Sequence, residues 1–251
     1  TAQDALFTQF YYTPTYINPS FAGTGKNNLR LSAVTKLQWF NLYKPFKYFS
    51  GGLDYSIYDY NQRNVLNLGL LANHSSKGGL GNTNVFGIVG RSFGTDNEDC
   101  SNWFLSLALQ AGICFTNVKP NEYIFIDQLD QTGITGDASQ VELFKTANSK
   151  SYFDFAGGGL MTISDFMIGI AGHHLNQPNA SFNGKPEDGK IPRKYTAHIS
   201  YRKEFESITI KPTIMGMVQG KSNVFTMGTL IDYYDFPVEF GLWYRNAVGV
   251  S

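Results

Sequence analysis

Large apolar side chains alternate with small or polar ones along residues 103–115. The apolar positions of this run are Trp103, Leu105, Leu107, Leu109, Ala111, Ile113 and Phe115. Because a β-strand sends alternate side chains to opposite faces, the run predicts a strand with one apolar face and one small, partly polar face. At about 3.3 Å per residue and a tilt of roughly 40°, this strand rises about 30 Å, close to the thickness of the hydrocarbon core of a bilayer.

The same alternation recurs along the chain after Gly25 and predicts an all-β fold. The runs that we interpret as strands cover residues 29–37, 50–58, 65–74, 83–92, 103–115, 153–163, 166–174, 195–202, 208–218, 224–233 and 236–246. Pro212 interrupts one of them and predicts a bulge. The recurrence favours a transmembrane antiparallel up-and-down β-barrel over a set of unrelated strands.

In these strands one set of alternate positions is apolar, and the other set, the opposite parity, holds most ionised groups. A lipid-facing exterior demands this arrangement. Outward rows are expected at Leu29/Leu31/Ala33/Leu37, Leu53/Tyr55/Ile57, Leu66/Leu68/Leu70/Ala72, Phe86/Ile88, Phe153/Phe155/Met161/Ile163, Phe166/Ile168/Ile170, Tyr195/Ala197/Ile199/Tyr201, Ile208/Ile210/Ile214/Val218, Phe225/Met227/Ile231/Tyr233 and Val238/Phe240/Leu242/Tyr244. Inward positions are expected at Arg30, Lys36, Asp54, Asn67, Asn73, Arg91, Gln110, Asp154, His198, Arg202, Lys211, Asp232, Glu239 and Arg245. We expect inward charges of opposite sign to pair and to fill a closed lumen, with ion selection as in a porin as the alternative.

Short connections alternate with longer ones between the predicted strands. The short ones are 59–64, 164–165, 203–207 and 234–235, and the long ones are 38–49, 75–82, 116–152 and 175–194, with 93–102 and 219–223 as exceptions. This is the outer-membrane barrel arrangement, with the short turns periplasmic, and a soluble sandwich has less reason for it. The odd number of strands would leave an edge unpaired in lipid. We therefore expect missed strands inside 116–152 (Glu122–Ile126 is a candidate) or, as the favoured explanation, a chain that continues past Ser251.

Composition narrows the class of protein further. Charged residues make up only 16% of the 251 residues, and the formal net charge is zero, so no basic field indicates nucleic acid. No apolar run is long enough for a transmembrane helix. Thr1 and Ala2 are interpreted as the scar of a cleaved signal peptide. Cys100 and Cys114 are expected to stay unbridged, because an extended segment holds them too far apart for a disulfide.

Residues 1–25 differ from the rest, because they are rich in aromatic side chains and are broken by Pro14 and Pro19. They predict an irregular N-terminal leader ahead of a barrel over residues 26–251. We expect this leader to enter or cap the periplasmic end of the barrel as a plug, with a disordered periplasmic tail as the alternative. The residues expected to form the plug or to bind a partner are Phe7, Phe10, Tyr11, Tyr12, Tyr16, Asn18, Pro19 and Phe21.

Three stretches carry a resemblance to a known family. They are Gln9-Phe10-Tyr11 through Tyr16-Ile17-Asn18-Pro19-Ser20-Phe21-Ala22-Gly23, then Gly172-His173-His174-Leu175-Asn176-Gln177-Pro178, and Leu242-Trp243-Tyr244-Arg245. In order and spacing the chain resembles the PorP/SprF family of type IX secretion system membrane proteins of Bacteroidetes. The resemblance implies a barrel of about fourteen strands in the full-length form, and no enzyme.

The resemblance further implies a role in secreting or attaching large cell-surface proteins, including gliding-motility adhesins. We therefore expect the chain to dock, retain or help export such an adhesin through its C-terminal domain, together with other secretion-system components and the lipid bilayer. The aromatic residues of the 38–49 connection are the expected surface-loop contact, namely Trp39, Phe40, Tyr43, Phe46, Tyr48 and Phe49. A passive outer-membrane porin or small-molecule channel is the main alternative, and a soluble β-sandwich binding protein is the third.

Other chemical motifs have simpler explanations. In a strand, His173 and His174 would face opposite sides, with His173 in the lumen and His174 at the membrane rim, so we expect no metal site there. Asp127, Asp130 and Asp137 lack the spacing of a calcium loop and are expected to be solvated. The glycines of 78–81 and 157–159 are interpreted as turns and bends. Without a nucleophile elbow or a phosphate-binding loop, no catalytic residue, cofactor or metal is predicted.

Overall fold

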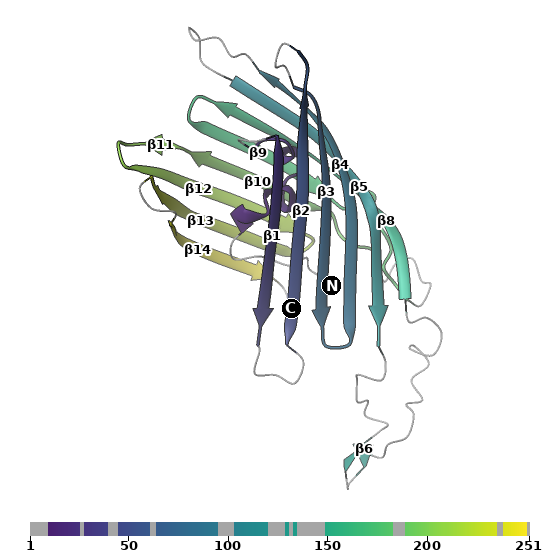
Figure 1. Ribbon diagram of the computed structural model, residues 1–251. Helices are drawn as coiled ribbons and strands as arrows, with labels where there is room; N and C mark the ends of the chain where they lie inside the picture. The colour runs from purple at the N-terminus through teal and green to yellow at the C-terminus, as the bar shows by residue number, and fades with distance from the viewer. Residues whose placement is uncertain are drawn as a thin grey trace.

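The chain folds into one strongly curved antiparallel sheet, seen in a computed structural model as a half-open cylinder (Figure 1). The structure describes residues 10–25, 28–39, 45–60, 64–94, 103–119, 129–130, 133–134, 149–182, 189–234 and 238–249. The sheet contains β1 (Leu29–Gln38), β2 (Phe46–Tyr58), β3 (Asn64–Lys77), β4 (Leu80–Gly94), β5 (Trp103–Val118), β8 (Ser149–Ile163), β9 (Phe166–His173), β10 (Lys194–Tyr201), β11 (Lys203–Glu204), β12 (Ile208–Gln219), β13 (Ser222–Tyr233) and β14 (Glu239–Gly249).

Each long strand pairs with its neighbour along the chain, from β1 at one edge to β14 at the other, and β11 extends the pairing beside β12. The predicted all-β, up-and-down antiparallel fold is confirmed. In the described residues β1 and β14 are the two edges of the sheet, so its closure into a barrel stays a prediction. A separate two-stranded sheet, β6 (Leu129–Asp130) with β7 (Gly133–Ile134), lies within the 116–152 connection, and Glu122–Ile126 is outside the described residues.

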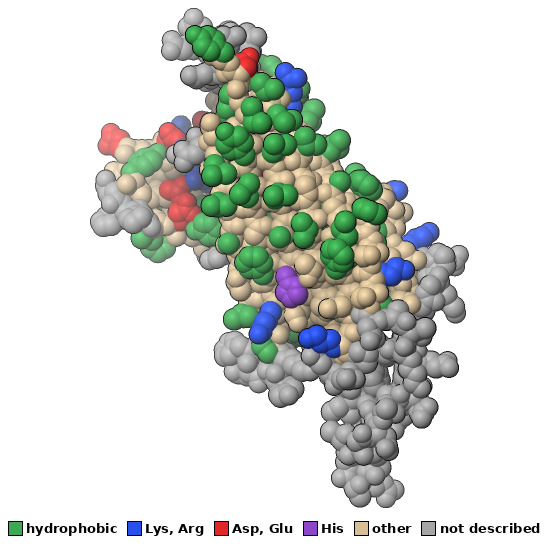
Figure 2. Space-filling model, turned by 45° about the vertical axis from the view of Figure 1, so that its right-hand side comes forward, with side chains coloured by type: hydrophobic (Ala, Val, Ile, Leu, Met, Phe, Trp, Pro, Cys, Tyr) green, Lys and Arg blue, Asp and Glu red, His purple; other side chains and the backbone are tan. Residues whose placement is uncertain are grey.

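The two faces of the sheet differ as the alternation predicts. Apolar side chains on the convex face are exposed, among them Leu31, Leu70, Leu109 and Ile170. Figure 2 shows hydrophobic side chains spread over the face that it draws. Side chains of the opposite parity, such as Asp54, are buried against the concave, inner face. The outward row predicted in residues 103–115 is confirmed, because these side chains lie under no second protein layer.

The predicted parity of β4 was wrong. Phe86 and Ile88 are buried on the inner face, whereas Val85 and Arg91 point outward. Both parities of this strand carry large apolar residues, so alternation alone does not select a face. Pairing decides it, because Phe86 lies opposite Gly112, where a Cβ would approach the Phe86 ring to 2.5 Å.

Two predicted connections were also too long. β3 and β4 continue to a tight turn at Gly78 and Gly79 where a loop over 75–82 was expected, and β2 already begins at Phe46. Long connections therefore share their end of the sheet with the tight turns at 78–79 and 220–221. On one edge of β12, Pro212 pairs with Thr229 of β13 without a register shift. On the other edge of β12, the pairing is interrupted at Pro212, between the parts that pair with β10 and with β11. Proline cannot donate a backbone hydrogen bond, which explains that break.

The leader forms three short helical turns, η1 (Phe10–Tyr12), α1 (Pro14–Ile17) and η2 (Pro19–Phe21). Pro14 and Pro19 stand at the starts of α1 and η2, where a missing amide hydrogen costs nothing. The turns lie within the curve of the sheet, coloured purple in Figure 1, and contact β1, β5 and β8. No helix in the described parts of the chain has the length and hydrophobicity needed to cross a bilayer.

Candidate functional site: the leader on the inner face of the sheet

Asn18 fastens the leader to the middle of the sheet. Its Nδ2 donates to the carbonyl oxygens of Gly159 in β8, at 3.0 Å, and Ile170 in β9, at 3.1 Å. Its Oδ1 accepts from the Ser20 amide at 2.9 Å and so caps η2. One buried side chain therefore holds the fold of the leader and its position at the same time.

The approach of Asn18 depends on a glycine in β8. A Cβ on Gly158 would lie 2.1 Å from Asn18 Oδ1, closer than two such atoms can approach. The predicted interpretation of the 157–159 glycines as bends is therefore incomplete, because Gly158 makes room for another segment of the chain. His173 adds a neighbouring contact, since its Nε2 lies 2.9 Å from the Ile17 carbonyl oxygen.

Asp54 forms the second attachment, where the leader turns into β1. Its Oδ1 accepts from the Gly23 amide at 2.8 Å, and its Oδ2 accepts from Arg30 Nε at 2.9 Å. Arg30 also donates to the Phe21 carbonyl oxygen at 2.6 Å. Gly23 has a φ of 76°, and a Cβ there would lie 2.3 Å from Asn67 Oδ1, so this turn requires glycine.

Aromatic side chains of the leader reach the β10–β14 half of the sheet. Tyr11 stacks on Trp243 with ring centroids 5.6 Å apart, and Phe21 lies 5.1 Å from the His198 ring. Tyr12 donates to Glu239 Oε2 at 3.2 Å. Partial burial, and then the charge of Glu239, raise the pKa of the Tyr12 phenol above its ordinary value.

Tyr16 lies near the other polar groups of the inner face. The Lys194 ammonium stands 5.0 Å from the centre of the Tyr16 ring. The predicted pairing of inward charges is seen in Arg30–Asp54 and in Lys211–Asp232. The arrangement gives the leader polar and aromatic contacts across most strands of the sheet.

Only one of the two histidines follows the predicted geometry, because His173 faces inward as expected and His174 does not lie at the rim. His174 leaves β9 with a φ of 55°, so its ring turns inward, where it is 8% exposed and its Nδ1 lies 2.7 Å from Asp154 Oδ2. The placement of His174 at the membrane rim was therefore wrong, because the residue is no longer in regular strand conformation. Among the described residues, no three His, Cys, Asp or Glu side chains are arranged to hold a metal ion.

The predicted leader residues thus gather on the inner face as far as they are described. Asn18 and Pro19 are almost fully buried. Phe7 and the side chain of Phe10 lie outside the described residues. Sequence reasoning placed Asp54 on the inner face but missed that it binds the leader, and it missed Ser56, whose hydroxyl donates to the Gly23 carbonyl oxygen at 2.9 Å.

The predicted surface-loop cluster is divided. Trp39 is 61% exposed and contacts Phe46, with ring centroids 4.9 Å apart. Tyr48 is buried on the inner face between the ammonium groups of Lys36 and Lys77, and Phe49 lies on the convex face. Placing Phe46, Tyr48 and Phe49 in a loop was wrong, since β2 includes all three. Phe40 and Tyr43 lie outside the described residues.

Predictions for the remaining residues can be followed only in part. Cys114 is buried, and Cys100 lies outside the described residues. Asp127 and Asp137 also lie outside them, and only the backbone of Asp130, in β6, is described.

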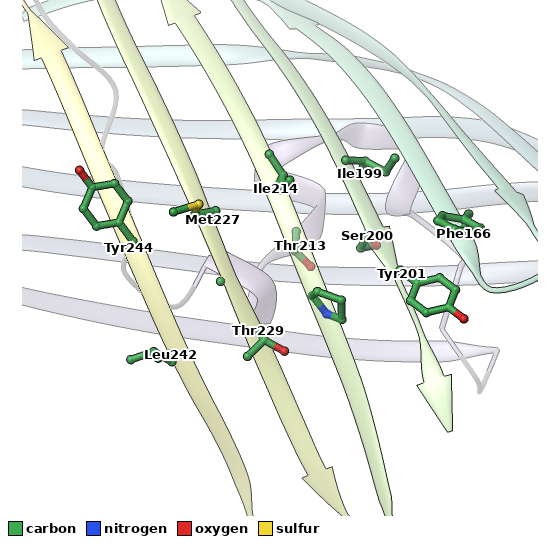
Figure 3. A pocket seen from close by; sticks show the side chains of 12 residues that line it. Phe166, Ile199, Ser200, Tyr201, Thr213, Ile214, Met227, Thr229, Leu242 and Tyr244 are labelled. Atoms are coloured by element: carbon green, nitrogen blue, oxygen red, sulfur yellow. The ribbon is translucent and has the colours of Figure 1, made fainter. Parts of the chain in front are cut away.

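A groove of about 530 Å³ crosses the convex face (Figure 3). Outward side chains form it, with Phe166 and Tyr201 at one side, Tyr244 at the other, and Ile214 and Thr229 between them. Its lining is almost wholly apolar, so it is continuous with the exposed apolar rows.

An apolar convex face and an inner face that holds the buried charged groups and the chain's own leader are features of a membrane protein built from strands. The family model described as type IX secretion system membrane protein PorP/SprF matches residues 1–251, and the chain belongs to this family. It is therefore a membrane component of the type IX secretion system. Comparison with curated proteins and with solved structures finds no match.

Proposed function

We propose that this protein docks or retains a large secreted surface protein, such as an adhesin, at the bacterial outer membrane. In this proposal the sheet closes into a barrel and the leader plugs it, so the molecule is a scaffold and not a passive channel. The observation that carries the proposal is the attachment of the leader across the inner face through Asn18 and Asp54. A porin needs an open lumen, and the contacts that hold the leader against the inner face support a plug instead.

The docking side is the end of the sheet with the longer connections, which is extracellular in outer-membrane barrels. Trp39 stands there with its ring mostly exposed and supported by Phe46. An exposed aromatic ring supported by a second, half-buried one is typical of the central contacts of protein interfaces. The C-terminal domain of the cargo would bind on this side, and other secretion-system components would bind the leader side.

The double variant Trp39→Ser/Phe46→Ser tests the docking surface. Loss of two aromatic anchors, each worth about 2 kcal/mol, should weaken cargo retention by about 10²–10³-fold. The measurement is recovery of the cargo with the tagged protein from native membranes in mild detergent. Trp103→Ser, at the opposite end of the sheet, is the matched control and should leave recovery unchanged. Equal recovery with the double variant would contradict the assignment of this surface.

Conductance tests the plug independently of the cargo. The reconstituted protein should be electrically silent in a planar bilayer. A steady open pore would favour the channel alternative, even if the cargo still co-purified.

A further inference from the structure

Charge is distributed unevenly between the two ends of the sheet. Apart from Asp154, which faces inward, the described acidic side chains stand toward the end with the 59–63 and 164–165 connections, namely Asp54, Asp59, Asp165, Glu204, Glu206, Asp232 and Glu239. The opposite end carries mostly lysine and arginine among the described residues, namely Lys36, Lys47, Lys77, Lys119, Lys150, Lys190, Arg193, Lys194 and Lys221. Figure 2 shows basic side chains at the lower end of the convex face and acidic ones toward its upper left.

A pocket of about 330 Å³ lies at this basic end, where β2, β3, β4 and β5 stop. Lys47 and Lys119 line it from the outer strands, and His74 and Asn117 line it beside the turn at Gly78–Gly79. All four side chains are exposed and belong to the convex face or its rim. His74 is held in place by a 2.9 Å hydrogen bond between its Nδ1 and Thr83 Oγ1.

Strand register shows what lies beneath the pocket. The first row across β2–β5 is polar and basic, with Lys47, Ser76, Gly81 and Asn117 side by side. The second row has an aromatic residue at each end, with Phe49, His74, Thr83 and Phe115. The third row is apolar apart from its glycine, with Gly51, Ala72, Val85 and Ile113.

This order matches the depth profile of one bilayer leaflet. Aromatic side chains mark the membrane interface, apolar rows face the acyl chains, and lysines beyond the aromatic belt stand at headgroup level. A pocket with two lysines, polar side chains and backbone of a glycine turn suits an anionic phosphate. Because the pocket continues directly into the apolar rows, its occupant should carry a phosphate and hydrocarbon chains together.

We propose that the Lys47–Lys119 pocket binds the phosphate headgroup of an anionic membrane lipid, whose chains lie along Phe49, Phe115 and the apolar row below them. The bound lipid would set the height of this end of the sheet in the membrane. It would also hold the β2–β5 quarter of the rim, beside Trp39, at the headgroup surface.

The test compares lipid binding by the purified protein in a non-ionic detergent, measured by native mass spectrometry. The probes are dioleoyl phosphatidic acid, dioleoyl phosphatidylcholine and inorganic phosphate. Lys47→Gln/Lys119→Gln removes two charges from the pocket. Lys203→Gln/Lys221→Gln removes two exposed charges elsewhere and is the matched control.

The unaltered protein should bind phosphatidic acid in preference to phosphatidylcholine. The pocket variant should lose about 30-fold in affinity for phosphatidic acid, since each lysine near an anionic surface contributes about a fivefold factor. The control variant should stay within about twofold. The proposal is overturned if the pocket variant binds phosphatidic acid as tightly as the unaltered protein, or if phosphatidylcholine binds equally well. Displacement by equimolar inorganic phosphate would equally overturn it, because the site would then recognise a free anion and not a lipid.

Discussion

Replacing Asn18 with Ala tests how firmly the inner face of the sheet holds the leader. The variant lacks the two hydrogen bonds to the Gly159 and Ile170 carbonyl oxygens and the cap on the Ser20 amide. At about 1 kcal/mol of net free energy for each bond, the loss is about 3 kcal/mol. The ratio of released to seated leader should therefore rise by about 150-fold.

Hydrogen exchange of the backbone amides of residues 10–25 measures this ratio directly, because exchange follows the population of the released form. These amides should exchange about 100-fold faster in Asn18→Ala, while those of the strands should keep their rates. Asn176→Ala is the control, since Asn176 Nδ2 also donates to a backbone carbonyl, that of Phe153 at 2.8 Å, but does not touch the leader. Unchanged protection of the leader in Asn18→Ala would refute the anchoring role of this side chain.

Three further substitutions have defined outcomes. Gly158→Ala introduces a Cβ at 2.1 Å from Asn18 Oδ1 and should expose the leader to added protease as Asn18→Ala does; a leader that stays resistant would contradict the steric argument. Asp54→Ala leaves Arg30 and the Gly23 amide without their carboxylate and should lower the free energy of unfolding by about 3 kcal/mol in urea titrations. An unchanged free energy of unfolding would mean that solvent replaces the carboxylate and would contradict this role of Asp54. Val85→Arg, one row inside the aromatic belt, should cost about 1–2 kcal/mol of folding free energy in lipid vesicles but little in detergent, and equal costs in both would argue against a lipid-facing Val85.

Much of the sheet could be predicted from the sequence because most strands are apolar on one parity only. β5 shows this clearly, since Leu105 to Phe115 contrast with Ser106, Ala108 and Gln110 on the other parity. The same argument failed for β4, where Phe86 and Val85 are both large and apolar. There the neighbouring strand decides, because only the inner face offers the Phe86 ring the space above Gly112.

The leader site was predictable only in part. Its aromatic side chains and Asn18 were visible as an unusual segment that needed burial. The acceptors of the Asn18 hydrogen bonds are backbone carbonyl oxygens. Every residue has one, so no sequence pattern marks them. The inward turn of His174 was equally hidden, because its positive φ arises where β9 ends and not from the residue type.

The Asn18 contacts also impose an order on how the polypeptide matures. Asn18 is 152 positions before Ile170, so its docking partners are made long after the ribosome has released the leader. Contacts that close such large loops form late. The leader is thus synthesised before β8 and β9 but seated only after they have formed, and an intermediate that lacks these strands has no place for it.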